Sequence, residues 1–243
     1  MRPRRGDYGF DAPYVPIWYG GWGLVALGLG AFYLAYFLDW LGGLAIGVGA
    51  VLGLSSASFV WTTRRGKFAV WNELLDSLAM RGDERVLDVG CGRGMVLNMV
   101  AERLVTGRAI GVDIWSSHDQ SGNAGAVTLA NAEREGVRDR VAICTGDMRQ
   151  LPFADRSFDL ITASLAIHNI LDAEGRAQAL VEIWRVLKPG GIALIVDFRH
   201  LDVYQRYFAS QAGALVERRG LGWRYWYAGP HAAACLIEVR RSI

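Results

Sequence analysis

The chain opens with two long apolar stretches and continues with short apolar runs separated by polar segments. No residue is charged over 12–38 or over 40–63, and Asp39 alone lies between the two stretches. Each stretch exceeds the roughly 20 apolar residues that a membrane-spanning helix needs. Beyond residue 84 the short runs alternate with helical patterns, which is typical of a parallel sheet with crossover helices.

A signal peptide, one long buried helix and a transmembrane hairpin are three interpretations of the first 63 residues. A signal peptide has an apolar core of about 7–15 residues and then a cleavage site, whereas two full-length runs follow one another here. An aspartate at a bilayer centre costs roughly 2.5–3.5 kcal/mol, so Asp39 belongs at an interface. We therefore predict a transmembrane hairpin over 17–63, with helices at about 17–38 and 44–61 and a turn at 39–43.

Basic residues flank both outer ends of the predicted hairpin. By the positive-inside rule they place both termini and the rest of the chain in the cytoplasm, so we expect a multi-pass membrane protein with two helices. Aromatic residues near the same ends fit an interfacial belt. The basic residues are Arg2, Arg4, Arg5, Arg64, Arg65 and Lys67, and the aromatic ones are Trp18, Tyr19, Trp22 and Trp61.

Glycines in the second helix stand four residues apart, as Gly43 with Gly47 and Gly49 with Gly53. Small residues at this spacing let two helices approach backbone to backbone. They favour a homodimer through the membrane helices, or they reflect only the frequency of glycine in such helices.

A glycine-rich turn follows a short apolar strand over 85–89. Gly90, Gly92 and Gly94 allow the backbone to approach a ligand without Cβ clashes, and a helix follows at about 95–104. A second apolar strand ends in Asp113, about twenty residues beyond the glycines, where a carboxylate binds a ribose in doubly wound folds. The pattern predicts a nucleotide-like ligand.

These segments resemble the class I S-adenosylmethionine (SAM)-dependent methyltransferases over roughly residues 68–200. The motif Asp-x-Gly-x-Gly-x-Gly of that family matches residues 88–94, Asp113 matches its ribose-binding acid and Asp147 its adenine-side acid. Residues 188–191, Lys-Pro-Gly-Gly, match its turn before the fifth strand, which we expect at 192–197. A nicotinamide-dependent dehydrogenase is a distant alternative, because its third glycine stands three residues after the second rather than two.

The resemblance implies an α/β fold with a doubly wound, seven-stranded, mainly parallel sheet whose last two strands form an antiparallel hairpin. It divides the chain into a juxtamembrane segment (1–16), the hairpin (17–63), an amphipathic linker helix (64–81) and the methyltransferase domain (82–243). The stripe on the linker helix indicates core packing or a membrane-surface face. The cofactor implied is SAM, with contacts expected from Asp88, Gly90, Cys91, Gly92, Gly94, Asp113, Ile114, Trp115, Asp147, Met148 and Ser164.

Two places could supply a general base. The segment after Asp113 holds Trp115, His118 and Asp119 within a few residues, which favours an acceptor site over a plain surface loop. His168 lies after the fourth strand, where relatives acting on quinones often carry a His-His pair; here the second position is Asn169. A lone histidine at that place is also a common helix cap. Asp197 and His200, after the fifth strand, are weaker candidates.

Charge and cysteine content narrow the function further. The net charge is only +2, and the basic excess lies at the ends of the apolar stretches, so nucleic acid is not an expected partner. Cys91, Cys144 and Cys235 show no metal-ligand spacing, and a cytosolic domain disfavours disulfides.

The sequence as a whole predicts a membrane-anchored enzyme that methylates a small lipophilic or lipid-borne acceptor with SAM. A protein lysine methyltransferase acting on a membrane protein and a non-catalytic SAM-binding scaffold are the alternatives. The acceptor atom stays open between nitrogen, oxygen, sulfur and carbon.

Overall fold

The computed structural model describes residues 4–37, 40–116 and 121–243, which form two compact units. The first unit consists of Met1–Gly9, Phe68–Leu221 and Ala234–Ile243, and the second of Phe10–Lys67 and Gly222–Ala233. These bounds differ from the expected ones, because a short N-terminal piece and the helix after Lys67 belong with the sheet. A loop near the C-terminus belongs instead with the two apolar helices.

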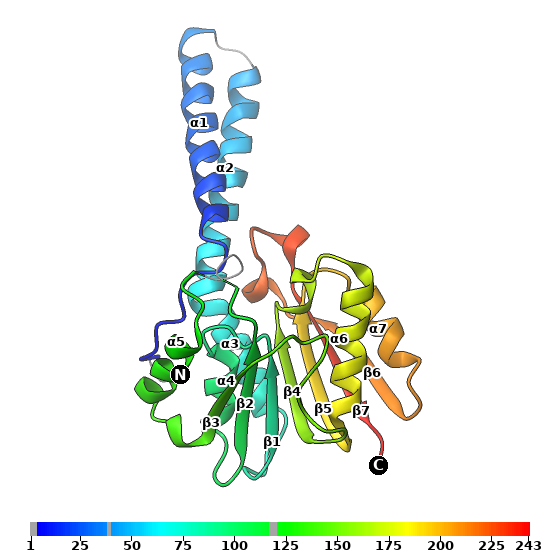
Figure 1. Ribbon diagram of the computed structural model, residues 1–243. Helices are drawn as coiled ribbons and strands as arrows, with labels where there is room; N and C mark the ends of the chain where they lie inside the picture. Colours follow the sequence, from blue (N-terminus) through cyan, green and yellow to red (C-terminus); the bar gives the residue numbers. More distant parts are fainter. Residues whose placement is uncertain (1–3, 38–39, 117–120) are drawn as a thin grey trace. The chain divides into compact units, whose positions relative to one another are not determined.

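The second unit is built on two antiparallel helices, α1 (Tyr14–Tyr36) and α2 (Trp40–Trp61) (Figure 1). Both are long and apolar enough to cross a membrane by length and composition. The predicted turn at 39–43 is wrong in part, because residues 40–43 are helical. Apolar Trp40 and Leu41 continue the helical pattern, and a glycine pair weakens a helix without ending it. After Trp61 the helix passes through a π-helical turn, η1 (Thr62–Gly66), into α3 (Lys67–Asp76).

Four buried glycines allow close packing of α1 against α2. A Cβ on Gly30 would lie 2.8 Å from the carbonyl oxygen of Gly42, and one on Gly49 would lie 2.9 Å from that of Gly23. Of the glycines singled out from the sequence, Gly49 is therefore inside the hairpin contact. The other three, Gly43, Gly47 and Gly53, have nothing within 4 Å of an added Cβ.

The loop Gly222–Ala233 packs on the end of α2 within the second unit. The carbonyl of Trp226 accepts a hydrogen bond from the Ser58 hydroxyl at 2.9 Å. The Trp223 ring stacks on Trp61 with the ring centroids 4.8 Å apart. The aromatic run noted in the sequence thus belongs to the unit that contains the two apolar helices.

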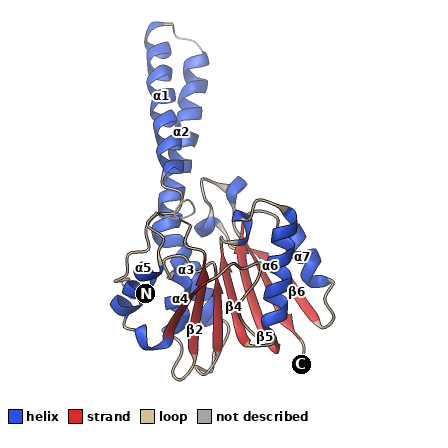
Figure 2. Cartoon of the chain, in the orientation of Figure 1, coloured by secondary structure: helices blue, strands red, loops and turns tan. Residues whose placement is uncertain are grey.

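The first unit contains one seven-stranded sheet in the order β3-β2-β1-β4-β5-β7-β6 (Figure 1). Figure 2 draws its strands in red. β1 to β5 are parallel, and β7 runs antiparallel between β5 and β6, so the predicted doubly wound sheet with a terminal antiparallel hairpin is confirmed. The strands are β1 (Arg85–Val89), β2 (Arg108–Asp113), β3 (Val141–Thr145), β4 (Phe158–Ser164), β5 (Leu187–Asp197), β6 (Ala214–Gly220) and β7 (Cys235–Arg241).

Helices cover the sheet and exclude water from the strands. α6 and α7 contribute Leu180, Ile183 and Phe208 to the main core against Leu87 and Ile161. α4 contacts β1 and β2, and α5 contacts β3. The bounds are α4 (Met95–Ala101), α5 (Gly125–Glu135), α6 (Ala173–Val186) and α7 (Leu201–Ala209), with single 3₁₀ turns η2 (Arg138–Arg140), η3 (Ile167–Asn169), η4 (Trp223–Tyr225) and η5 (Pro230–Ala232).

Two local predictions need correction. β5 begins at Leu187 rather than at residue 192, so the Lys-Pro-Gly-Gly segment lies inside the strand. The helix before β5 ends at Val186. Lys188 precedes Pro189 and is therefore restricted to extended backbone, so the helix cannot continue through it. The stripe on α3 packs into the first unit, where Trp71 is fully buried.

Candidate functional site

The carboxyl ends of four parallel strands bring the predicted site residues to one edge of the sheet. Val89 pairs with Val112 on one side and with Ala163 on the other, while Asp113 pairs with Thr145. The segments that follow β1, β2, β3 and β4 therefore meet at this edge. In doubly wound folds ligands bind at the carboxyl edge.

The turn after β1 has a shape that only glycine supplies. Gly90, Gly92 and Gly94 have φ values of +69°, +52° and +81°. A Cβ on Gly90 would also lie 2.4 Å from the Cβ of Ala166 and 3.4 Å from the Cε of Met148. The bare backbone of this turn forms a cradle of the kind that accepts a nucleotide-like ligand.

Two side chains of helix α5 donate hydrogen bonds to carbonyl groups of the turn. The Thr128 hydroxyl donates to the carbonyl of Gly92 at 2.7 Å, and the Asn131 amide donates to the carbonyl of Arg93 at 3.0 Å. Cys91 is buried within the turn, and burial raises the pKa of its thiol well above the usual range. Its side chain is therefore an uncharged packing group.

The carboxylate of Asp113 lies beside the turn at the end of β2. It accepts hydrogen bonds from the backbone N–H of Gly92 at 2.8 Å and of Trp115 at 2.6 Å. Trp115 adopts a left-handed φ of +61°, and its indole N–H donates to Thr145 at 2.8 Å. Ile114 is exposed. The structure thus brings the turn, the acid and the indole together.

Asp147 follows β3 and forms an ion pair with Arg149, with Nη2 and Oδ2 2.6 Å apart. Hydrogen bonds from the Arg149 guanidinium lower the pKa of Asp147. The carboxylate is half-buried and remains charged at neutral pH. Met148, next to it, approaches the turn as described above, so this strand end also reaches the site.

Two residues expected to contact the cofactor have partners within the protein. Asp88 is buried and accepts a hydrogen bond from the Thr162 hydroxyl at 2.7 Å, and burial raises the pKa of Asp88 to about 7. The Ser164 hydroxyl accepts from the Trp71 indole at 3.0 Å. These contacts support the strand ends from within, and a direct contact of either residue with a cofactor stays a prediction.

His168 lies in η3 beside the turn and pairs with a buried acid. Its Nδ1 is 2.8 Å from Oδ1 of Asp197, whose side chain is 1% exposed. Nδ1 is buried, and its approach to Asp197 lacks the geometry of a hydrogen bond. The Phe198 ring packs against the imidazole with the centroids 4.7 Å apart. An imidazole beside a carboxylate is a candidate proton acceptor.

Two further residues at the same edge have a left-handed backbone. Leu165 and His200 have φ values of +54° and +58°, which are unfavourable for residues with a Cβ. His200 starts α7, and its pKa is lowered by burial and by the charge of Arg176. Strained residues of this kind cluster at ligand-binding sites.

The sequence-based prediction for His118 and Asp119 lies outside the described residues. Both flanks of their loop are described. The Asn123 amide donates to the carbonyl of Ser116 at 3.3 Å, and the Arg93 guanidinium donates to the carbonyl of Ser121 at 2.7 Å.

Sequence reasoning missed the pairing of His168 with Asp197 and the contacts of Arg93. The pairing of His168 with Asp197 was predictable from the family's topology, because the two residues lie at the carboxyl ends of neighbouring parallel strands. For the contacts of Arg93, the sequence indicated only that this residue lies between two glycines of the turn. Its partners far along the chain left no local pattern.

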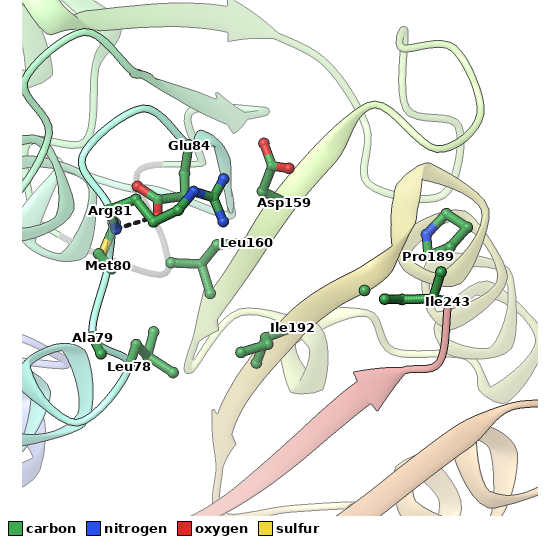
Figure 3. Close-up of a pocket in the computed structure, with 11 residues that line it drawn as sticks. Leu78, Ala79, Met80, Arg81, Glu84, Asp159, Leu160, Pro189, Ile192 and Ile243 are labelled. Atoms are coloured by element: carbon green, nitrogen blue, oxygen red, sulfur yellow. Dashed lines mark hydrogen bonds between the residues drawn. The ribbon is translucent and has the colours of Figure 1, made fainter.

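A hollow of about 430 Å³ opens at the opposite, amino edge of β1, β4 and β5 (Figure 3). Its charged groups are used internally: Glu84 accepts from the backbone N–H groups of Arg81 and Gly82, and Asp159 binds Lys188 at 2.9 Å. The hollow is separate from the residues assembled at the carboxyl edge.

Comparison with known proteins gives the same assignment of fold. A model of the methyltransferase domain matches residues 87–195. The chain is 34% identical over 137 residues to the ubiquinone/menaquinone biosynthesis C-methyltransferase UbiE of Dinoroseobacter shibae, covering 56% of this chain and 51% of that protein. It is 30% identical over 177 residues to the 2-phytyl-1,4-naphtoquinone methyltransferase of Thermosynechococcus vestitus, covering 70% of this chain and 73% of that protein.

Among solved structures, the YcgJ protein from Bacillus subtilis superposes with a TM-score of 0.56 at 21% identity, over 72% of this chain and 99% of that one. The likeness concerns the fold alone. The chain spans about half the length of the first UbiE relatives that it matches.

Proposed function

The chain belongs to the class I SAM-dependent methyltransferases, and we propose that it transfers the methyl group of SAM to a small lipophilic or membrane-borne acceptor. The observation that carries the proposal is the His168–Asp197 pair beside the glycine turn. It combines a proton acceptor with a fixed orientation at the edge where the fold binds its ligands.

The residues of the carboxyl edge fit the cofactor. SAM supplies an electrophilic methyl group on a sulfonium centre. The glycine turn offers bare backbone to the amino acid portion, Asp113 offers a carboxylate to the ribose hydroxyls, and Asp147 offers one on the adenine side. Trp115 adds an indole next to Asp113. Positioning of this kind accounts for about 7–11 kcal/mol of barrier lowering in well-oriented reactions.

His168 acts on the acceptor in this proposal. Nε2 takes a proton from an acceptor hydroxyl while the Asp197 carboxylate stabilises the imidazolium that forms. Loss of the proton makes the oxygen, and in an aromatic ring the neighbouring carbon, electron-rich. The new O–CH3 or C–CH3 bond would form as the bond from the methyl group to sulfur breaks and S-adenosylhomocysteine leaves. On a ring carbon, the hydrogen of that carbon would then be lost as a proton. The same pair therefore serves oxygen and ring-carbon methylation.

Two observations support a lipophilic acceptor. The relatives named above carry quinone substrates in their names, and the chain has two helices long and apolar enough to cross a membrane. Many large side chains on these helices are exposed, including Leu24, Phe32 and Leu54. An apolar hairpin in the same chain would keep the enzyme at a bilayer, where such acceptors concentrate. The flanking arginines favour cytoplasmic ends.

Self-association through α2 is a further part of the proposal. Gly43 and Gly47 are exposed on the hairpin, one turn apart, and an added Cβ there meets nothing within 4 Å. A second hairpin could approach this face closely. Cross-linking in detergent with Gly47→Leu as the disruptive variant tests it.

The decisive experiment follows the methyl group. Purified full-length protein in lipid nanodiscs is incubated with methyl-labelled SAM and a membrane extract, and the products are separated into solvent-extractable lipids and protein. Label in an extractable compound with a hydroxylated ring supports the proposal. Label in a protein band indicates a protein lysine methyltransferase, and binding of SAM without any transfer indicates a scaffold.

Variants of the pair assign its role. His168→Ala should lower turnover by about 10²–10⁴-fold while SAM affinity, measured by calorimetry, stays within error of wild type. Asn169→Ala changes the neighbouring exposed side chain and is the matched control. Normal turnover in His168→Ala would transfer the role of base to the loop that contains His118 and Asp119.

A further inference from the structure

The guanidinium of Arg93 joins three separate segments of the first unit. Arg93 belongs to the glycine turn itself, and its side chain is only 10% exposed. Nε donates to the carbonyl of Asp7 at 3.0 Å, and Nη2 pairs with Oδ2 of Asp7 at 2.7 Å. Nη1 donates to the carbonyl of Ser121 at 2.7 Å. One side chain therefore holds the turn, the N-terminal segment and the loop after β2.

The N-terminal segment, residues 4–9, is fixed to this unit by specific bonds. The buried amide of Asn131 accepts from the Asp7 N–H at 2.8 Å and donates to the Asp7 carbonyl at 2.7 Å. Tyr8 is buried, its hydroxyl donating to Glu135 at 3.0 Å and accepting from Asn98 at 3.2 Å. The neutral hydrogen bonds to Asn131 and Asn98 each contribute about 0.5–1.5 kcal/mol. The segment is an ordered part of the unit.

Gly9 completes the contact. Its φ is +64°, and a Cβ there would lie 2.8 Å from Nη1 and 3.1 Å from Cδ of Arg93. The Asp7 carboxylate accepts from the Gly9 N–H at 3.0 Å, and this bond is the largest of the causes that lower the pKa of Asp7. The segment is thus shaped to receive the guanidinium.

The same loop after β2 is attached to the turn at both ends. At its start, Asp113 accepts from the Gly92 N–H. At its far end, Ser121 accepts from Arg93. Since Asp113 and the turn are the residues that would hold the cofactor, a shift of Arg93 would change the spacing between them.

We propose that Arg93 is a positioning residue for SAM and that Asp7 and Gly9 of the N-terminal segment act on the cofactor site through their contacts with Arg93. Arg93 fixes the glycine turn against Asp113 and Ser121, and the N-terminal segment fixes Arg93. Affinity for the cofactor then depends on residues that precede the apolar helices. The inference rests on the assignment of SAM to this site and does not depend on the acceptor.

Calorimetric titration of full-length protein with SAM, without any acceptor, tests the proposal. Arg93→Ala should raise the dissociation constant about tenfold, the effect of one charge-assisted contact network. Asp7→Ala should raise the dissociation constant about two- to fivefold, because Asp7 is largely exposed and its ion pair is screened. Gly9→Ala should raise it by a similar factor, because the added Cβ would displace the Arg93 guanidinium. Arg93→Lys, which keeps the charge but not the fork of donors, should give an intermediate affinity.

A variant in the same segment provides the control. Arg4 pairs with Glu102 at 2.6 Å and does not contact the turn, so Arg4→Ala should leave SAM affinity unchanged. In the double variant Arg93→Ala/Asp7→Ala the affinity should equal that of Arg93→Ala, because the two residues act through one contact. Hydrogen exchange at residues 90–94 should rise in Arg93→Ala and Gly9→Ala alike.

Specific results would overturn the proposal. Wild-type affinity in Arg93→Ala or in Gly9→Ala, at a temperature where the variant is folded, would show that the contact does not position the cofactor. Equal losses in Arg4→Ala and Asp7→Ala would show that the segment acts through general stability. Failure of the acceptor experiments, with SAM binding and these differences intact, would count against the proposed acceptor class alone.

Discussion

Glycines in the turn after β1 and glycines in the helical hairpin are needed for different physical reasons. Gly90 has a left-handed φ of +69° and also faces the Cβ of Ala166, so it is required by its own backbone and by its neighbour. Gly49 lies in an ordinary helix, where alanine is the better residue, and is required only because the backbone of α1 lies opposite. The turn depends on local conformation, whereas the hairpin depends on which face a glycine occupies.

The largest effect is expected in the turn. Gly90→Ala adds left-handed strain and a contact 2.4 Å from Ala166, which together should cost about 2–5 kcal/mol of stability in the first unit. Binding of SAM should fall below detection in calorimetry, because the turn must move to relieve the contact. Retained affinity would show that the cradle is not where the cofactor binds.

The next largest effect is expected from the buried carboxyl group of Asp88, in the strand before the turn. The folded state holds the proton of Asp88 up to about pH 7, while the unfolded chain releases it near its ordinary value of 3.8. Between these values the folded state binds more protons, so the stability of the first unit should fall as pH rises from 4 to 7, by up to about 4 kcal/mol. Asp88→Asn should remove this slope in hydrogen exchange of β1. An unchanged slope would mean that another group is responsible.

The helical hairpin should respond to glycine substitution according to face. Gly49→Ala places a Cβ 2.9 Å from the Gly23 carbonyl oxygen and should destabilise the α1–α2 packing by about 1–3 kcal/mol. Gly28→Ala, on an open face of α1, should be neutral or stabilising by up to about 1 kcal/mol. Thermal unfolding in detergent compares the two. Equal losses would contradict the face argument.

Backbone strain can be measured without a steric clash at Gly136. This residue has a φ of +75° at the end of α5, and an added Cβ meets nothing within 4 Å. Gly136→Ala should cost about 1 kcal/mol and leave SAM affinity unchanged. A loss close to that of Gly90→Ala would mean that strain alone accounts for the turn.

Local patterns explain what the sequence predicts well. β1 and the glycine turn lie within ten consecutive residues, and each parallel strand is a short segment rich in apolar residues, so the sheet and its carboxyl edge follow from composition and spacing. The start of α2 at Trp40 differs from the prediction, because the charge of Asp39 does not indicate how far a turn extends. A charged residue indicates a solvent-exposed position, but it does not determine the residue at which a helix begins.

Contacts between distant residues explain what the sequence does not predict. Arg93 and Asp7 are 86 residues apart, and Ser58 and Trp226 are 168 apart. Neither pair leaves a periodic signal, because each depends on how the whole chain folds. The His168–Asp197 pair was within reach only through the topology of β4 and β5.

The division of the chain into units has a practical consequence for protein engineering. The chain passes from one unit to the other after Gly9, Lys67, Leu221 and Ala233, so no single cut separates them. Removal of residues 1–66 would delete Asp7 and would also delete Phe59, whose ring packs on the buried Tyr227. A hairpin-free enzyme therefore requires two edits: a short linker from Gly9 to Phe68, and a tight turn in place of residues 222–233.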